Sequence, residues 1–99
     1  FHRMVHNFVV QGGCPRGDGW GSLEWNQRSE LSSSLRYKIG SVGLASVGKD
    51  SEGVQFFISH NYAPHLDGRY TIFAEVIKGF DVIGNLNVGD QMISIERIL

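Results

Sequence analysis

Two polar residues lie inside otherwise apolar stretches of the sequence. Arg3 opens a segment rich in Val, Phe and Met, and Gln55 is the only strongly polar residue of VQFFIS (54–59). An arginine is always charged and presents several donors in a planar fork, which suits it to stabilise electron density that develops during a reaction. A glutamine inside an apolar strand must find hydrogen-bond partners. The plainer interpretations are a surface ion pair for Arg3 and a structural hydrogen bond for Gln55, and composition alone favours both.

The other reactive side chains do not suggest a metal, thiol or phosphate site. His2 and His6 are four residues apart, which suits a shared metal ion on a helix, but their segment is typical of a strand. The single cysteine, Cys14, allows no internal disulfide and has no basic cluster beside it to favour a thiolate. GDGWG (17–21) lacks the Gly-Lys-Ser/Thr ending of a phosphate-binding loop. We therefore expect no metal and no cofactor.

The composition is that of one small folded domain. The chain has 99 residues, too few for two domains, and 41% of them are hydrophobic, which is enough to form a core. Nine basic and ten acidic residues give a net charge of -1, so no basic excess points to nucleic acid. No apolar stretch approaches the roughly 20 residues that span a bilayer, so we expect no membrane segment. Thirteen glycines predict many tight turns.

The elements that must position Arg3 and Gln55 are predicted to be short strands. Residues 1–13 are typical of strand, divided in two by a turn at His6–Asn7. Further strands are predicted at 39–46, 54–59, 70–77 and 92–99, a helix at 80–86, a helical turn at 63–66, and loops at 12–21, 22–37 and 48–53. Glycines within 39–46 predict a bend or a bulge. The pattern indicates an all-β sandwich or barrel with one short helix.

Three stretches carry a family resemblance beyond this periodicity. They are FHRMVHNFVVQGG (1–13), GSVGLASVGKDSEGVQFFIS (40–59) and HLDGRYTIFAEVIKGFDVI (65–83). Their order and spacing resemble the cyclophilins, the cyclosporin-binding family of peptidyl-prolyl cis-trans isomerases. The resemblance implies a closed antiparallel barrel of eight strands with a helix at each end. Because the likeness begins at the family's third strand, we expect residues 1–99 to form a single partial domain of a longer chain. The resemblance thus implies an incomplete cyclophilin-like antiparallel β-barrel without the first two strands and first helix.

The resemblance implies catalysis of X-Pro bond isomerisation in peptides and folding proteins. The barrier to this rotation is about 20 kcal/mol, because amide resonance is lost as the bond twists. In the twisted state the prolyl nitrogen regains a lone pair, and a cationic donor aimed at it stabilises that state selectively. The resemblance assigns this role to Arg3 and adds Phe8 and Gln11 to the catalytic group.

An apolar wall and two glutamines complete the implied proline site. The wall for the proline ring consists of Phe8, Val9, Phe57 and Leu66. Gln11 and Gln55 match glutamines that hold the substrate backbone and position the arginine. Alternation along a strand places Val9 and Gln11 on one face and Phe8 on the other, so the strand must twist or bulge if Phe8 and Gln11 share a site.

The remaining implied contacts depart from the usual family residues. The segment 45–47, with Ala45 and Ser46, matches the segment that pairs with substrate backbone as an added strand, although Asn is usual where Ser46 stands. His65 replaces a frequent Trp, which implies weaker binding of cyclosporin-like inhibitors, and Tyr70 replaces a frequent His. The expected partners are proline-containing peptides and unfolded protein chains. The departures at Val9, Ser46 and His65 leave open a second hypothesis, a non-catalytic module that binds proline peptides within a larger protein.

Overall fold

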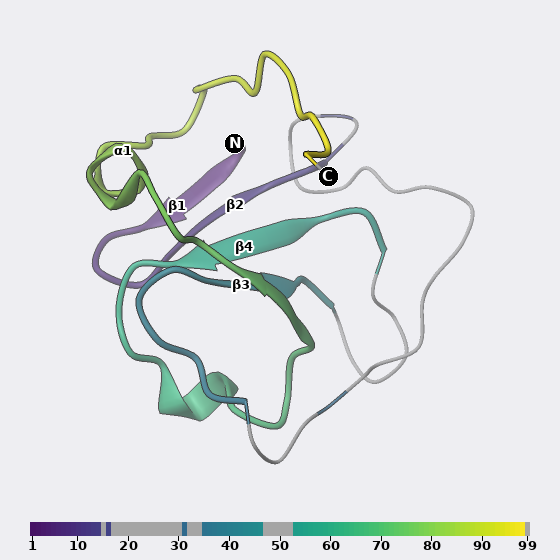
Figure 1. Ribbon diagram of the computed structural model, residues 1–99, viewed down its shortest axis with the longest axis vertical. Helices are drawn as coiled ribbons and strands as arrows, with labels where there is room; N and C mark the ends of the chain where they lie inside the picture. Colours follow the sequence, from purple (N-terminus) through teal and green to yellow (C-terminus); the bar gives the residue numbers. More distant parts are fainter. Residues whose placement is uncertain (15, 17–30, 32–34, 47–52, 99) are drawn as a thin grey trace.

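The fold is a single antiparallel sheet of five short strands (Figure 1). The computed structural model describes residues 1–14, 16, 31, 35–46 and 53–98. Its elements are β1 (Arg3–Val5), β2 (Val9–Gly12), β3 (Ser41–Leu44), β4 (Phe56–Ser59), a 3-10 helix (Pro64–Leu66), β5 (Ile72–Glu75) and α1 (Phe80–Gly84). The strand order is β1-β2-β4-β3-β5, and in the part of the chain described the sheet is not closed. The predicted β-rich fold with one short helix is confirmed, as is the helical turn near residue 64; most of the predicted loops lie outside the described residues.

The turn between β1 and β2 depends on Asn7. This residue has a φ of 57°, in the left-handed region that asparagine tolerates better than most side chains. The amide of Phe8 donates to the carbonyl of Val5 at 3.0 Å and closes the turn. The resulting hairpin pairs Arg3 with Gln11 across the two strands. The predicted turn at His6–Asn7 is therefore confirmed, and it places the arginine opposite a glutamine.

The bend or bulge predicted within residues 39–46 is also confirmed, in β3. The register between β3 and β5 shifts between Val42 and Gly43, as expected for a β-bulge. On its other side β3 pairs regularly with β4, where Gly43 lies opposite Phe57. A bulge on one side of a strand lets that strand bend while its second partner keeps its register.

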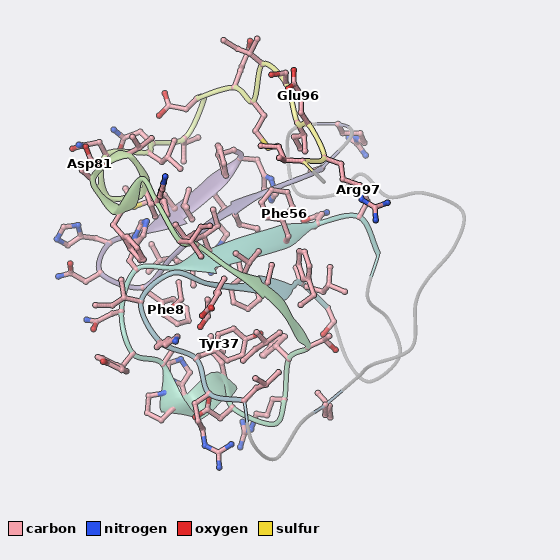
Figure 2. The ribbon with its side chains drawn as sticks, viewed as in Figure 1. Phe8, Tyr37, Phe56, Asp81, Glu96 and Arg97 are labelled. Carbon is pink, nitrogen blue, oxygen red and sulfur yellow. The ribbon has the colours of Figure 1, made fainter. Side chains whose placement is uncertain are left out.

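The register gives the sheet two distinct faces. Arg3, Gln11, Phe57 and Gly43 are cross-strand neighbours in one row, and such neighbours share a face. This face packs against the segment that contains the 3-10 helix, and its core consists of Val9, Tyr37, Phe57, Ala63 and Leu66. The row on the opposite face includes Val10, which is fully buried. Figure 2 shows Phe8 and Tyr37 on one side of β4 and Phe56 on the other.

The predicted strand at residues 92–99 is wrong for its described part, residues 92–98, which have no regular structure. A strand requires a partner for its backbone hydrogen bonds, and among the described residues none pairs with this segment in the sheet. Its side chains are correspondingly exposed, with Ile93, Ile95 and Ile98 at 97%, 81% and 91%. The predicted helix at 80–86 exists but is shorter, and it begins after Gly79, which adopts a φ of 87°.

No helix among the described residues is both long enough and apolar enough to cross a membrane.

Candidate functional site

A cavity of about 190 Å³ opens on the face of the sheet that carries Arg3. Because a water molecule occupies about 30 Å³ in the liquid, the cavity holds a group of several heavy atoms. Nine of the residues singled out from the sequence line it: Arg3, Phe8, Val9, Gln11, Ala45, Ser46, Phe57, Leu66 and Tyr70. They come from β1, β2, β4, the end of β3 and the turn around the 3-10 helix. The fold therefore brings together residues that are far apart in the sequence.

Two hydrogen bonds join the polar side chains at the cavity. Nη1 of Arg3 donates to Oε1 of Gln11 at 3.3 Å, and Nε2 of Gln11 donates to Oε1 of Gln55 at 3.0 Å. The amide of Gln11 thus uses its acceptor toward the arginine and its donor toward the second glutamine, which fixes the orientation of the amide. Gln55 does not line the cavity. It acts on the site through Gln11, which in turn restricts the guanidinium of Arg3.

Much of the cavity lining is apolar. Val9, Phe57 and Leu66 are buried, at 3%, 6% and 8% exposure, and each presents part of its side chain to the cavity. The ring of Tyr70 meets the ring of Phe57 edge to face, with 6.0 Å between centroids. Buried apolar groups of this kind bind an apolar ring by removing its surface from water. The cavity therefore combines a charged donor with an apolar wall.

Phe8 lines the cavity although it lies outside β2, where it was expected. It precedes β2 and follows the left-handed Asn7, so the alternation of strand side chains does not apply to it. The pairing of β2 with β1 and β4 continues without a register shift, so the predicted alternative of a bulge in this strand is wrong. His65 does not line the cavity; its ring stacks on Phe8, with 5.2 Å between centroids and 29° between planes.

The segment that follows β3 forms one rim of the cavity. Ala45 and Ser46 both line it. The amide of Ala45 already donates to the carbonyl of Gln55 at 3.0 Å, so any added peptide strand has to use other main-chain groups of this rim. Val47, the third residue predicted for this role, lies outside the described residues.

Tyr37 is a residue of this site that the sequence analysis missed. It is 1% exposed, and its ring stacks on that of Phe57 with 5.4 Å between centroids. Burial raises the pKa of its hydroxyl, and the nearby Asp67 and Tyr70 raise that pKa further. One signal could have revealed it: Tyr37 is the only aromatic residue between Trp25 and Phe56. A single large ring in a polar segment is a candidate for anchoring that segment to the core.

Within the residues that the structure describes, no group of three or more His, Cys, Asp or Glu side chains is placed to hold a metal ion.

The structure thus combines an antiparallel sheet with a cavity that an arginine, a linked glutamine and several apolar side chains line. Residues 1–97 match the family described as cyclophilin type peptidyl-prolyl cis-trans isomerase/CLD. The chain belongs to this family, as its motifs predicted.

Relatives of known name agree with this assignment. The chain is 40% identical over 93 residues to peptidyl-prolyl cis-trans isomerase B of Bacillus subtilis (strain 168), which covers 93% of the chain and 65% of that protein. It is 37% identical over 98 residues to a peptidyl-prolyl cis-trans isomerase of Helicobacter pylori (strain ATCC 700392 / 26695), covering 96% of the chain and 60% of the relative. The chain thus spans somewhat less than two thirds of the length of these relatives.

A solved structure shows the same fold. The crystal structure of a Cryptosporidium parvum cyclophilin type peptidyl-prolyl cis-trans isomerase, obtained in the presence of the dipeptide Ala-Pro, superposes with a TM-score of 0.80 at 33% sequence identity. The superposition covers 86% of this chain and 60% of that one.

Proposed function

We propose that this chain is a peptidyl-prolyl cis-trans isomerase that acts on X-Pro bonds in peptides and unfolded proteins. The observation that carries the proposal is the position of the Arg3 guanidinium, held by Gln11 beside an apolar cavity that Phe57 and Leu66 line. The relative whose structure was obtained in the presence of Ala-Pro supports the choice of a proline-containing ligand.

In this mechanism the apolar wall holds the proline ring while the preceding carbonyl rotates. Arg3 donates to the prolyl nitrogen, whose lone pair is available only when the amide is twisted, so its stabilisation is larger in the transition state than in either planar isomer. Ser46 lines the rim, and in this mechanism its main chain holds the substrate backbone. No covalent bond forms and no proton is transferred, so the site needs no general base.

The test is exchange NMR on an Ala-Pro-Phe peptide with the chain and its Arg3→Ala variant. Removal of a donor that acts in the transition state lowers kcat by about 100-fold to 1,000-fold. Arg97→Ala, at an exposed position outside the cavity, is the matched control and leaves the rate unchanged. Equal cis-trans exchange rates for the chain and Arg3→Ala, with both shown to be folded, contradict this mechanism.

The same experiment separates catalysis from binding alone. The departures from the usual family residues at Val9, Ser46 and His65, which the resemblance implies, motivate the alternative of a module that holds a proline peptide without turnover. Peptide resonances that shift on addition of the chain, while the exchange rate stays at its uncatalysed value, select that second function.

We also propose that cyclosporin-like inhibitors bind weakly. The ring of His65 stacks on Phe8 at the edge of the cavity and offers less apolar surface than an indole. His65→Trp is expected to raise the affinity for cyclosporin, measured by titration calorimetry. An unchanged or lower affinity opposes the proposal.

A further inference from the structure

We propose that Tyr37 positions Phe57, the ring that forms the wall of the proline cavity, and that Gly43 is required because it leaves room for Tyr37. The proposal rests on the proposed function for its substrate. Tyr37 does not line the cavity, so it is a positioning residue that acts through Phe57. The position of the Phe57 wall therefore depends on a residue whose own segment contributes no other described residue to that wall.

The ring of Tyr37 packs on the ring of Phe57 and restricts its motion. The two rings are nearly parallel, at 22°, with 5.4 Å between their centroids. Tyr70 contacts Phe57 edge to face from another direction, at 89°. A ring held by a stacked neighbour and a perpendicular neighbour has few rotamers open to it, because interiors pack at nearly crystalline density.

Tyr37 is itself fixed by hydrogen bonds to both sides of the turn that supplies Leu66. Its backbone amide donates to Oδ1 of Asp67, and its carbonyl accepts from the amide of Ala63 at 3.3 Å. Its hydroxyl lies 3.1 Å from the carbonyl oxygen of Tyr70 and 3.2 Å from that of the next residue. Tyr37 therefore connects three cavity residues, Phe57 through its ring and Leu66 and Tyr70 through their neighbouring backbone.

The glycine at position 43 follows from this arrangement. Gly43 is not among the glycines with positive φ, so its backbone does not require the absence of a side chain. A β-carbon added there would lie 2.7 Å from Cζ of Phe57 and would overlap the hydroxyl oxygen of Tyr37. Gly43 also pairs with Phe57 across β3 and β4. The two residues are thus complementary, since the tyrosine hydroxyl occupies the space that the glycine leaves.

A set of variants tests this dependence with the full chain. Tyr37→Leu removes the stacked ring, Tyr37→Phe removes the hydroxyl alone, and Gly43→Ala fills the gap. The double variant Tyr37→Phe/Gly43→Ala replaces the hydroxyl by the new methyl group, and Tyr62→Phe, at a position 72% exposed, is the control. Three quantities are measured for each variant: KM and kcat for Ala-Pro-Phe per folded molecule, by exchange NMR, and the ring motion of Phe57, by relaxation dispersion.

We expect Tyr37→Leu to raise KM about threefold to tenfold, the factor that loss of one aromatic pair represents in an equilibrium. The Phe57 ring is expected to move faster in that variant, whereas Tyr37→Phe and Tyr62→Phe stay within about twofold of the parent in KM. Gly43→Ala raises KM, and the double variant recovers part of that loss. Such a recovery shows that the two substitutions are energetically coupled, as expected for neighbours, whereas two independent structural defects would add.

Two results overturn the inference. In the first, Tyr37→Leu lowers the fraction of folded molecules but leaves KM and the Phe57 ring motion unchanged. In the second, the double variant is as impaired as Gly43→Ala alone. If the parent chain does not catalyse exchange, the proposed function fails by itself, and the Phe57 ring motion together with the dissociation constant of the peptide still decide the role of Tyr37.

Discussion

Raising the pH above about 10 is expected to destabilise this chain through one buried hydroxyl. Tyr37 is 1% exposed and its hydroxyl donates toward backbone carbonyls, so the ionised form loses both solvent and its hydrogen bond. Burial, then Asp67, then Tyr70 raise its pKa in the folded state above the ordinary value of about 10. In alkaline solution the unfolded chain therefore releases this proton before the folded chain does.

The sign and size of the effect follow from proton linkage. The contribution of Tyr37 to the free energy of unfolding is fully present below the ordinary tyrosine pKa. It is lost as the pH rises, because the folded state then binds more protons than the unfolded state. The limiting slope is about 1.4 kcal/mol per pH unit for one group. Between pH 10 and pH 11.5 the loss amounts to about 2 kcal/mol, a large fraction of the stability of a small domain.

Urea denaturation at a series of pH values, for the parent chain and for Tyr37→Phe, measures this loss. The phenylalanine variant starts about 1 kcal/mol less stable at neutral pH because it lacks a hydrogen bond, but its decline above about pH 10 is shallower. Tyr62→Phe, at an exposed position, controls for loss of a tyrosine as such. Parallel stability curves for the parent and Tyr37→Phe across this alkaline range would refute the reasoning.

Three further outcomes are expected. Gln11→Leu removes the acceptor that holds Arg3 and lowers kcat/KM by about fivefold in exchange NMR, whereas Gln91→Leu at an exposed position does not; equal losses would oppose the role of Gln11. Asn7→Ala costs about 1 kcal/mol in urea denaturation because residue 7 has a φ of 57°, while Asn7→Gly costs less, and the reverse order would contradict the turn. Val10→Ala, at a fully buried site, costs about 2 kcal/mol, and a neutral result would indicate that the opposite face of the sheet is loosely packed.

Local rules predicted those parts of the fold that depend on near neighbours in the chain. The turn at Asn7, the bulge at Gly43 and the 3-10 turn near Pro64 each follow from residue types within a few positions. The strand at 92–99 was predicted from apolar content, but a strand exists only where another backbone completes its hydrogen bonds. Among the described residues no such partner is paired with it.

Motifs predicted which residues line the candidate site, whereas the contacts that depend on side-chain packing were not predicted. All nine of the described residues that line the cavity were chosen from the family resemblance. Tyr37 was missed: its isolation as an aromatic residue in a polar segment suggested an anchor, but its contact with Phe57 joins positions 20 apart that no periodicity relates. Phe8 lines the cavity as predicted but without the bulge that alternation implied, because alternation describes residues inside a strand and Phe8 stands one position before it.

The hydrogen bond between Gln11 and Gln55 has a consequence for how the chain folds. It closes a loop of 44 residues, and such closure costs about 3 kcal/mol of chain entropy before any contact repays it. Non-local contacts of this kind raise contact order and slow folding. A ligand that bridges Arg3 and Phe57 binds only the finished sheet and stabilises it by mass action, by about 2.7 kcal/mol at 100 times its Kd. A chain proposed to act on the slow steps of other chains is thus expected to be stabilised by its own substrates.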